Sequence, residues 1–251
     1  MRFLSSACHT GTLFPAVVAL LLSFSAADAI VLGDVSSLGV HVVRVVGAGG
    51  RQCSGTVIDN QHVTTAGHCA AVAVVIDGKY IAAANRTQSA TLNDGRVITV
   101  HGDAAILSFR QPLPTSVAPI KIGVQGIDGA FVIAGYGTTN EQRWNLGKLH
   151  EAKVVVHVPF KLVAPDRIGD LTASACFGDS GGAVLRNGEL VGVITRASHP
   201  HPVIACGHLT HYAPVVATPP AEYHPHDGYE VSAAPRNPQR RLMVRRGVMP
   251  R

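Results

Sequence analysis

The chain has 251 residues, of which 47% are hydrophobic and only 15% charged, so a largely disordered protein is excluded. A formal net charge of +5 is small for this length and does not indicate nucleic-acid binding. The 26 glycines and 15 prolines, together with few aromatic residues, favour many short strands joined by turns over a helical bundle.

The first 29 residues have the pattern of a secretory signal peptide. Arg2 supplies a positive start, residues 13–24 are apolar, and residues 27–29 (Ala-Asp-Ala) match the site before signal-peptidase cleavage. The apolar run is short for a permanent membrane span, and an uncleaved N-terminal anchor is the alternative. We therefore predict a secreted protein, extracellular or periplasmic, with no membrane attachment after cleavage.

Beyond residue 29 the chain is predicted to be all-β. Short runs rich in valine and isoleucine alternate with turn residues, and no helical apolar period of useful length occurs. Asn187-Gly188 predicts a tight hairpin because this pair tolerates positive φ at both positions, and residues 93–95 (Asn-Asp-Gly) predict another. The predicted strands are residues 40–46, 72–76, 97–100, 105–109, 131–134, 153–158, 183–185 and 190–194.

The proline-rich stretch 111–119 predicts a crossing between two groups of strands. A second change of composition occurs near residue 217, after which proline and arginine are frequent up to residue 251. Such a segment predicts an extended or disordered tail. A solvated tail without a specific role and a cationic surface anchor are the two alternatives for it.

The strongest indication of function is the sequence Gly-Asp-Ser-Gly-Gly at residues 178–182. A serine hydroxyl is a poor nucleophile unless a base removes its proton, and it needs N–H groups aimed at the oxyanion that forms on attack. The glycines around Ser180 allow turn conformations and let a substrate approach the backbone closely. An ordinary glycine-rich turn is the alternative.

Two further residues complete a candidate catalytic set. His68 lies in Thr-Ala-Gly-His-Cys (residues 65–69), and an imidazole is the side chain best suited to accept a proton near neutral pH. Asp103 leads directly into an apolar strand, where a carboxylate with little solvent around it can fix a histidine tautomer and stabilise the imidazolium. A surface turn aspartate, such as Asp77 or Asp94, is the alternative reading.

The order histidine, aspartate, serine, carried by TAGHC (65–69), DAAIL (103–107) and GDSGG (178–182), resembles the chymotrypsin–trypsin family of serine peptidases, of the secreted bacterial type. The resemblance extends from residue 30 to about residue 216. It implies two antiparallel six-stranded β-barrels, residues 30–114 and 115–216, with the active site in the cleft between them. It also implies a serine endopeptidase that forms an acyl-enzyme intermediate and uses no cofactor and no metal.

Export favours disulfides, because the compartment beyond the membrane is oxidising. Removal of the signal peptide removes Cys8 and leaves four cysteines, whose spacing alone leaves three pairings open. The resemblance implies the pairs Cys53–Cys69 and Cys176–Cys206, each of which would brace a loop that carries a catalytic residue.

The resemblance also assigns groups that bind substrate. The backbone N–H groups of Gly178 and Ser180 would form the oxyanion hole, and Thr195-Arg196-Ala197 resembles the segment that pairs with the substrate backbone as an added strand. Ser174 aligns with the base of the specificity pocket, where relatives that cut after arginine or lysine carry aspartate. Because Ala197 and Thr210 stand where many relatives have glycine, a preference for small or medium apolar side chains is predicted.

Ile30 begins a sequence, Ile-Val-Leu-Gly, that resembles the N-terminus exposed when relatives are activated. In the family that free amine pairs with the aspartate before the catalytic serine, here Asp179, because a buried carboxylate needs such a partner. Ile30 directly follows the predicted signal-peptidase site, so we predict that signal cleavage itself creates the activating N-terminus. A short propeptide cut elsewhere is the alternative.

This chain departs from the family at two points. Ala183 replaces the proline that usually follows Gly-Gly, which is a tolerable change, and residues 217–251 are too rich in proline to supply the family's C-terminal helix convincingly. That helix is either missing or reduced to a short version near residues 240–244.

Three other functions fit the sequence less well than an endopeptidase. A catalytically silent binding module usually lacks a triad member, whereas this chain keeps all three. An α/β-hydrolase esterase shares the string Gly-x-Ser-x-Gly but needs alternating helices and another residue order. The histidine pairs 199/201, 208/211 and 224/226 lie in proline-rich loops without acidic ligands, so they are predicted to be surface histidines and not metal ligands. The predicted partners are peptide or protein substrates, with protein inhibitors as further candidates; nucleic acid is not expected, and a monomer is.

Overall fold

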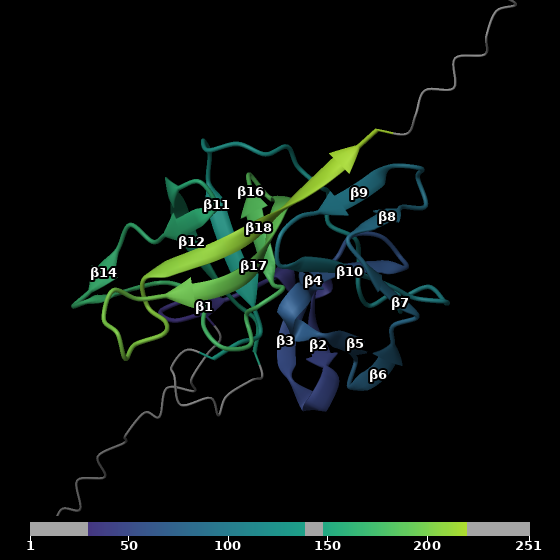
Figure 1. Cartoon of the computed structure of the whole chain (residues 1–251), viewed down its shortest axis with the longest axis horizontal. Helices are drawn as coiled ribbons and strands as arrows, with labels where there is room; N and C mark the ends of the chain where they lie inside the picture. The colour runs from purple at the N-terminus through teal and green to yellow at the C-terminus, as the bar shows by residue number, and fades with distance from the viewer. Residues whose placement is uncertain (1–29, 139–147, 220–251) are drawn as a thin grey trace, which may run out of the picture. The chain divides into compact units, whose positions relative to one another are not determined.

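The computed structural model describes residues 30–138 and 148–219, which lie within one compact unit. These residues form short antiparallel strands and brief 3-10 turns (Figure 1). No helix within the two described ranges is long and apolar enough to cross a membrane. The predicted signal peptide, residues 1–29, lies outside the described residues. Of the predicted tail, residues 217–251, residues 217 and 218 belong to the last strand, and the part beyond residue 219 lies outside the described residues.

The first half of the described chain forms an open sheet in the order β6-β5-β2-β3-β4-β10-β7. Valine is the most frequent residue of its buried cluster, which also contains the Cys53–Cys69 disulfide. The strands are β2 (Val42–Gly47), β3 (Gln52–Val57), β4 (His62–Ala66), β5 (Ala71–Ile76), β6 (Lys79–Ala82), β7 (Asn85–Thr87) and β10 (Ala104–Ser108).

The second half contains a closed barrel. Its six strands pair in the circular order β11-β12-β13-β18-β17-β16, and β16 returns to β11. These strands are β11 (Phe131–Gly135), β12 (His150–Val158), β13 (Lys161–Val163), β16 (Ala183–Arg186), β17 (Glu189–Ser198) and β18 (Leu209–Thr218). A small separate hairpin joins β14 (Arg167–Ile168) to β15 (Leu171–Thr172).

Strands from the N-terminal part of the chain also join the barrel. β1 (Asp34–Val35) pairs with β12, and β9 (Val97–Val100) pairs with the end of β18. β8 (Ser89–Thr91) pairs with β9, whereas the edge strands of the first sheet, β6 and β7, are not paired with each other.

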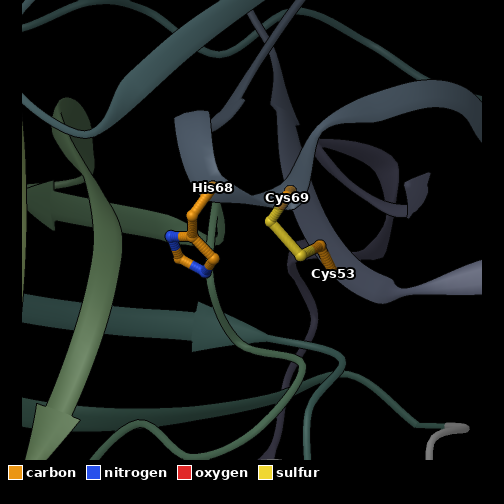
Figure 2. A group of neighbouring side chains, drawn as sticks. All are labelled: Cys53, His68 and Cys69. Atoms are coloured by element: carbon orange, nitrogen blue, oxygen red, sulfur yellow. A yellow bond between two sulfur atoms is a disulfide. The ribbon is translucent and has the colours of Figure 1, made fainter. Parts of the chain in front are cut away.

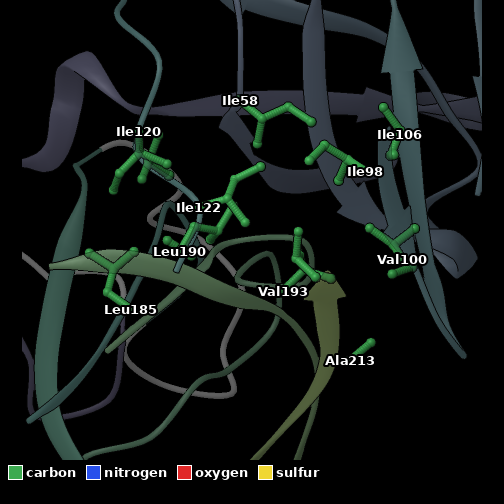
Figure 3. Packing of buried hydrophobic residues seen from close by; sticks show 14 of the residues in the cluster. Ile58, Ile98, Val100, Ile106, Ile120, Ile122, Leu185, Leu190, Val193 and Ala213 are labelled. Atoms are coloured by element: carbon green, nitrogen blue, oxygen red, sulfur yellow. The ribbon is translucent and has the colours of Figure 1, made fainter. Parts of the chain in front are cut away.

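A shared hydrophobic core joins the two halves. Ile58, Ile98 and Ile106 from the first half belong to one buried cluster with Leu190 and Val193 of the barrel (Figure 3). Burial of apolar surface stabilises by roughly 25 cal/mol per Å², so this cluster favours one arrangement of the two halves. A site built from both halves requires such a fixed arrangement.

The predicted all-β, chymotrypsin-like fold is confirmed, with one barrel closed by six strands and the other half an open, seven-stranded sheet. The Asn187-Gly188 hairpin joins β16 to β17, with φ values of 52° and 81°. The valine and isoleucine pattern does not predict β3 and β4, because serine, threonine, glycine and cysteine occupy much of these buried strands.

Candidate active site

Three side chains from distant parts of the sequence form a hydrogen-bonded chain. The imidazole of His68 lies between the other two, with Nδ1 2.6 Å from Asp103 Oδ2 and Nε2 3.0 Å from Ser180 Oγ. The backbone N–H of His68 donates to Asp103 Oδ1 at 2.8 Å. Asp103 therefore holds the histidine at two points and leaves Nε2 facing the serine hydroxyl.

The pairing of β4 with β10 explains why His68 and Asp103 meet. These strands are antiparallel with Ala66 opposite Ala104, so the residues just beyond this pair lie side by side. The N–H of Gly67 donates to the carbonyl of Asp103 at 3.1 Å. A Cβ at position 67 would lie 2.9 Å from Asp103 Oδ1, so glycine is needed for this close approach.

The histidine–aspartate pair is more open to solvent than the sequence predicts. The side chain of His68 is 37% exposed and that of Asp103 is 46% exposed. Asp103 precedes β10 and therefore lies at the rim of the sheet, whereas the strand residues that follow it are buried. The exposed rim leaves room for a peptide to approach the imidazole.

Ser180 lies in a sharp turn that precedes β16. Gly178 and Gly181 have φ values of 93° and 85°, in the left-handed region that favours glycine. A Cβ on Gly181 would lie 2.2 Å from the carbonyl oxygen of Ser54, so the turn packs directly against the first sheet. Neither the Gly178 N–H nor the Ser180 N–H donates to another described residue.

Both disulfides that the resemblance implies are present. Cys53 pairs with Cys69 beside the imidazole of His68 (Figure 2), and Cys176 pairs with Cys206. The first ties β3 to the turn that carries His68, and the second ties the loop before Ser180 to the loop before β18. Donor atoms of Cys53, His68 and Cys69 gather within 4.8 Å, but both sulfurs are bonded in the disulfide, so this group offers no thiolate to a metal.

A cavity of about 1090 Å³ opens over the three side chains and is lined from both halves of the molecule. It includes five of the predicted substrate-binding residues, Gly178, Ser180, Thr195, Arg196 and Ala197. The other lining residues are Ala48, Gly49, Gly50, Arg51, Gln52, Cys53, His68, Asp103, Thr138, Cys176, Phe177, Ala205, Cys206 and His211.

The predicted pocket residues Ser174 and Thr210 do not line this cavity, because both are fully buried behind its wall. Ser174 Oγ donates to the Ala175 carbonyl at 3.0 Å and accepts from the Gly207 N–H at 2.7 Å. Thr210 Oγ1 accepts from the Ala175 N–H at 2.9 Å. Their polar groups are satisfied within the protein, and no carboxylate stands at this position.

Asp179 is fully buried directly beside Ser180. Its carboxylate accepts hydrogen bonds from the N–H groups of Cys176 and Gly137, both at 2.8 Å, and from the Ile30 N–H. Burial raises the pKa of Asp179 to about 7, although these hydrogen bonds oppose the rise. Ile30 is also fully buried, and the hydrogen bond from its N–H places its nitrogen beside Asp179, the carboxylate predicted as its partner.

Among the described residues, no carboxylate is hydrogen-bonded to His199, His201, His208 or His211, the histidines of the predicted surface pairs. The rings of His199 and His208 meet edge to face at 5.9 Å, and His211 Nε2 lies 2.8 Å from Ser198 Oγ. Burial, followed by the charges of His199 and other neighbours, lowers the pKa of His208. The pair 224/226 lies outside the described residues.

Sequence reasoning missed two residues that contact this site. Arg51 donates from Nη1 to the carbonyl of His68 at 3.2 Å and lines the cavity. Ser54 lies behind the Ser180 turn and donates from Oγ to the carbonyl of Gly178 at 2.9 Å. Their signal in the sequence is their position beside Cys53, a residue already singled out.

A serine, a histidine and an aspartate in hydrogen-bonded order, at a cavity between an open β-sheet and a closed β-barrel, define the class of chymotrypsin-like serine peptidases. The family model described as Trypsin matches residues 30–218. The chain therefore belongs to the trypsin family.

Three relatives show how distant the similarity is. The chain is 26% identical to Trypsin zeta of Drosophila erecta over 179 residues, which cover 57% of this chain and 64% of the relative. It is 26% identical to Trypsin of Xenopus laevis, covering 57% of this chain and 69% of the relative. It is also 26% identical to Serine protease SP24D of Anopheles gambiae, covering 65% of this chain and 70% of the relative. The chain thus spans somewhat less than two thirds of the Drosophila relative.

Proposed function

We propose that this chain is a secreted serine endopeptidase that hydrolyses peptide bonds through an acyl-enzyme intermediate. The observation that carries the proposal is the hydrogen-bonded order Asp103, His68, Ser180 at the mouth of a cavity large enough for an extended peptide. Peptides and proteins are its substrates, protein inhibitors are further candidate partners, and the chain acts as a monomer.

The chemistry follows from the positions of the groups. Ser180 Oγ attacks the carbonyl carbon of the scissile bond while its proton passes to His68 Nε2. Asp103 accepts the Nδ1–H and stabilises the imidazolium without taking the proton. The N–H groups of Gly178 and Ser180 bind the oxyanion, and the imidazolium then protonates the departing amine. Water repeats the sequence on the acyl-enzyme and releases the acid.

The substrate backbone is expected to pair with Thr195-Arg196-Ala197. Along β17 the edge facing β16 is hydrogen-bonded as far as Ile194, whose N–H donates to the Gly182 carbonyl and whose carbonyl accepts from the Gly181 N–H. The segment beyond Ile194 has no such partner on this edge among the described residues, and it lines the cavity beside the nucleophile. An extended peptide adds as a strand at such an edge.

A catalytically silent binding module is the second candidate function. A fluorophosphonate probe separates it from the endopeptidase, because the probe reacts only with an activated serine. Covalent labelling of the chain that begins at Ile30, lost in the variant Ser180→Ala, supports the endopeptidase. Absence of label on the unmodified chain would favour the silent module.

Cleavage is expected after small or medium apolar residues. Position 174 lacks the carboxylate that a buried arginine or lysine would need, and Thr210 occupies space behind the cavity wall. A side chain before the scissile bond that does not fit the pocket lowers kcat/KM by about 10- to 200-fold. A series of peptide anilides that differ only in the residue before the scissile bond measures the preference, and faster cleavage after arginine or lysine would overturn it.

The variant Thr210→Gly is the matched test of the same pocket. It removes the buried side chain while the residues of the hydrogen-bonded triad stay unchanged. We expect kcat/KM to rise for phenylalanine and leucine substrates relative to alanine substrates. An unchanged ranking would show that Thr210 does not limit the pocket.

Activation is proposed to need a free amine at Ile30. With a peptide nitrogen there, burial holds the pKa of Asp179 at about 7, above its ordinary value of 3.8. A carboxyl whose pKa is raised on folding contributes stability below about pH 4, and that contribution is lost as the pH rises through about 7. An α-ammonium at Ile30 favours the charged carboxylate and removes this loss.

Two chains on a Ser180→Ala background test this, one beginning at Ile30 and one extended by two residues. The extended chain should lose stability in urea between pH 5 and pH 8, whereas the chain beginning at Ile30 should not. With Ser180 restored, only the latter should be active at pH 8. Equal pH profiles and equal activities for the two chains would contradict the role of the amine.

A further inference from the structure

Ser54 connects the first sheet to the turn that carries Ser180. It lies in β3 directly after Cys53 and is fully buried. Its backbone N–H donates to the Ser180 carbonyl at 2.9 Å, and its Oγ donates to the Gly178 carbonyl at 2.9 Å. One residue of the first sheet thus binds both residues whose N–H groups are proposed to form the oxyanion hole.

Ser54 is itself held in place by two further hydrogen bonds. The Tyr136 N–H, at the end of β11, donates to Ser54 Oγ at 2.8 Å. Thr65 Oγ1, from β4, donates to the Ser54 carbonyl at 2.8 Å. The Ser54 hydroxyl therefore accepts one bond and donates another, which leaves it a single orientation.

These contacts fix the peptide planes around the Ser180 N–H. A peptide unit is planar, so binding the Gly178 carbonyl fixes the plane shared by Gly178 and Asp179. Binding the Ser180 carbonyl fixes the plane that follows Ser180. The peptide unit that carries the Ser180 N–H joins Asp179 to Ser180, so it lies between the two fixed planes. The peptide unit that carries the Gly178 N–H ends at the Gly178 Cα, where the first fixed plane begins.

The turn needs such contacts because its glycines permit other conformations. Gly178 and Gly181 adopt positive φ, but glycine populates negative φ about as readily. Within the described residues, Ser54 Oγ is the hydrogen-bond donor to the Gly178 carbonyl. Without it, the peptide between Gly178 and Asp179 would keep only the bond from the Asp179 N–H to the Cys176 carbonyl, which is long at 3.2 Å, and its carbonyl would lose its contact with the first sheet.

We propose that Ser54 is a positioning residue that orients the Gly178 and Ser180 N–H groups toward the oxyanion. This inference rests on the proposed endopeptidase function. Ser54 does not line the cavity, so it is expected to act through the Gly178 turn and to affect the transition state more than peptide binding. Removing its hydroxyl raises the energy of the oxyanion while leaving ground-state binding of the peptide unchanged.

The variant Ser54→Ala tests the proposal in the chain that begins at Ile30, with kcat expressed per active site by burst titration. We expect kcat to fall about 10- to 100-fold, less than the roughly 10²–10³-fold effect of removing a donor outright, with KM unchanged. The inhibition constant of a peptide trifluoromethyl ketone, which forms an oxyanion on Ser180, should rise by the same factor. An unchanged kcat would overturn the proposal.

Two further variants separate positioning from a merely structural role. Thr56→Val removes another buried hydroxyl of β3, one without a hydrogen-bond partner among the described residues, and should leave kcat and the inhibition constant unchanged. Ser54→Thr keeps the hydroxyl and should restore most of the kcat lost in Ser54→Ala. A Ser54→Thr variant as slow as Ser54→Ala, or a Thr56→Val variant equally impaired, contradicts positioning. Failure of the unmodified chain to react with fluorophosphonate instead rejects the underlying function.

Discussion

Alanine at position 180 is expected to lower kcat by about 10⁶-fold, because no other group can then form the acyl-enzyme. The variant keeps the cavity and the backbone N–H groups of residues 178 and 180, so peptide binding and KM should change little. His68 and Asp103 remain paired, but Nε2 faces no hydroxyl from which it can remove a proton. Initial rates with a peptide anilide, together with fluorophosphonate labelling, measure the loss.

Ser198→Ala is the matched control for Ser180→Ala. Ser198 Oγ also lies within hydrogen-bond distance of a histidine, 2.8 Å from His211 Nε2, but no aspartate is hydrogen-bonded to that ring among the described residues. This variant should keep both labelling and turnover. If Ser180→Ala retained label, or if Ser198→Ala lost it, the assignment of the nucleophile would be wrong.

The second large effect is expected for Asp103→Asn, with kcat lowered by about 10⁴-fold. The backbone N–H of His68 requires an acceptor at Oδ1, so the asparagine oxygen takes that position. Its amide nitrogen then replaces Oδ2 and donates to Nδ1. The imidazole is thereby forced to carry its proton on Nε2, where it can no longer accept one from Ser180. Rates with a peptide anilide, corrected for the fraction folded, measure this effect.

Asp59→Asn provides the control for Asp103→Asn, since Asp59 also pairs with a histidine, 2.8 Å from His62 Nδ1, but lies outside the cavity. Burial raises the pKa of Asp59, but hydrogen bonds from His62 and Gln61 outweigh this effect. The pKa of Asp59 therefore lies below its ordinary value of 3.8. The carboxylate therefore stabilises the fold above about pH 4, and this contribution is lost as the pH falls through the lowered pKa. Asp59→Asn should lower stability at pH 7 and leave kcat unchanged. Equal losses of kcat in both variants would contradict the role of Asp103.

Much of the fold follows from local patterns. Valine and isoleucine runs predict strands wherever one face or both faces of the strand are buried, as in β9 and β11. The same rule fails for β3 and β4, because their buried positions hold serine and threonine whose hydroxyls bond to neighbouring backbone. Closure of only one barrel also escapes prediction, because the pairing that closes it, β13 with β18, joins residues far apart in the sequence.

The candidate catalytic residues are the part of the site that the sequence predicted by itself. The proposed chemistry rests on the residue types of His68, Asp103 and Ser180, on their order and on their glycine-rich surroundings, because each role demands a particular side chain in a particular turn. The cysteines beside them indicate the loops that are braced. Composition likewise determined the all-β class.

Only the tertiary structure decided how these groups work together. The side chains of Ser174 and Thr210 are withdrawn behind the cavity wall, Asp103 is exposed at a strand end, and Asp179 receives the Ile30 nitrogen. The bond from Ser54 to the Gly178 turn joins residues 124 positions apart in the chain. Such contacts depend on how two sheets pack, which no local pattern of residues encodes.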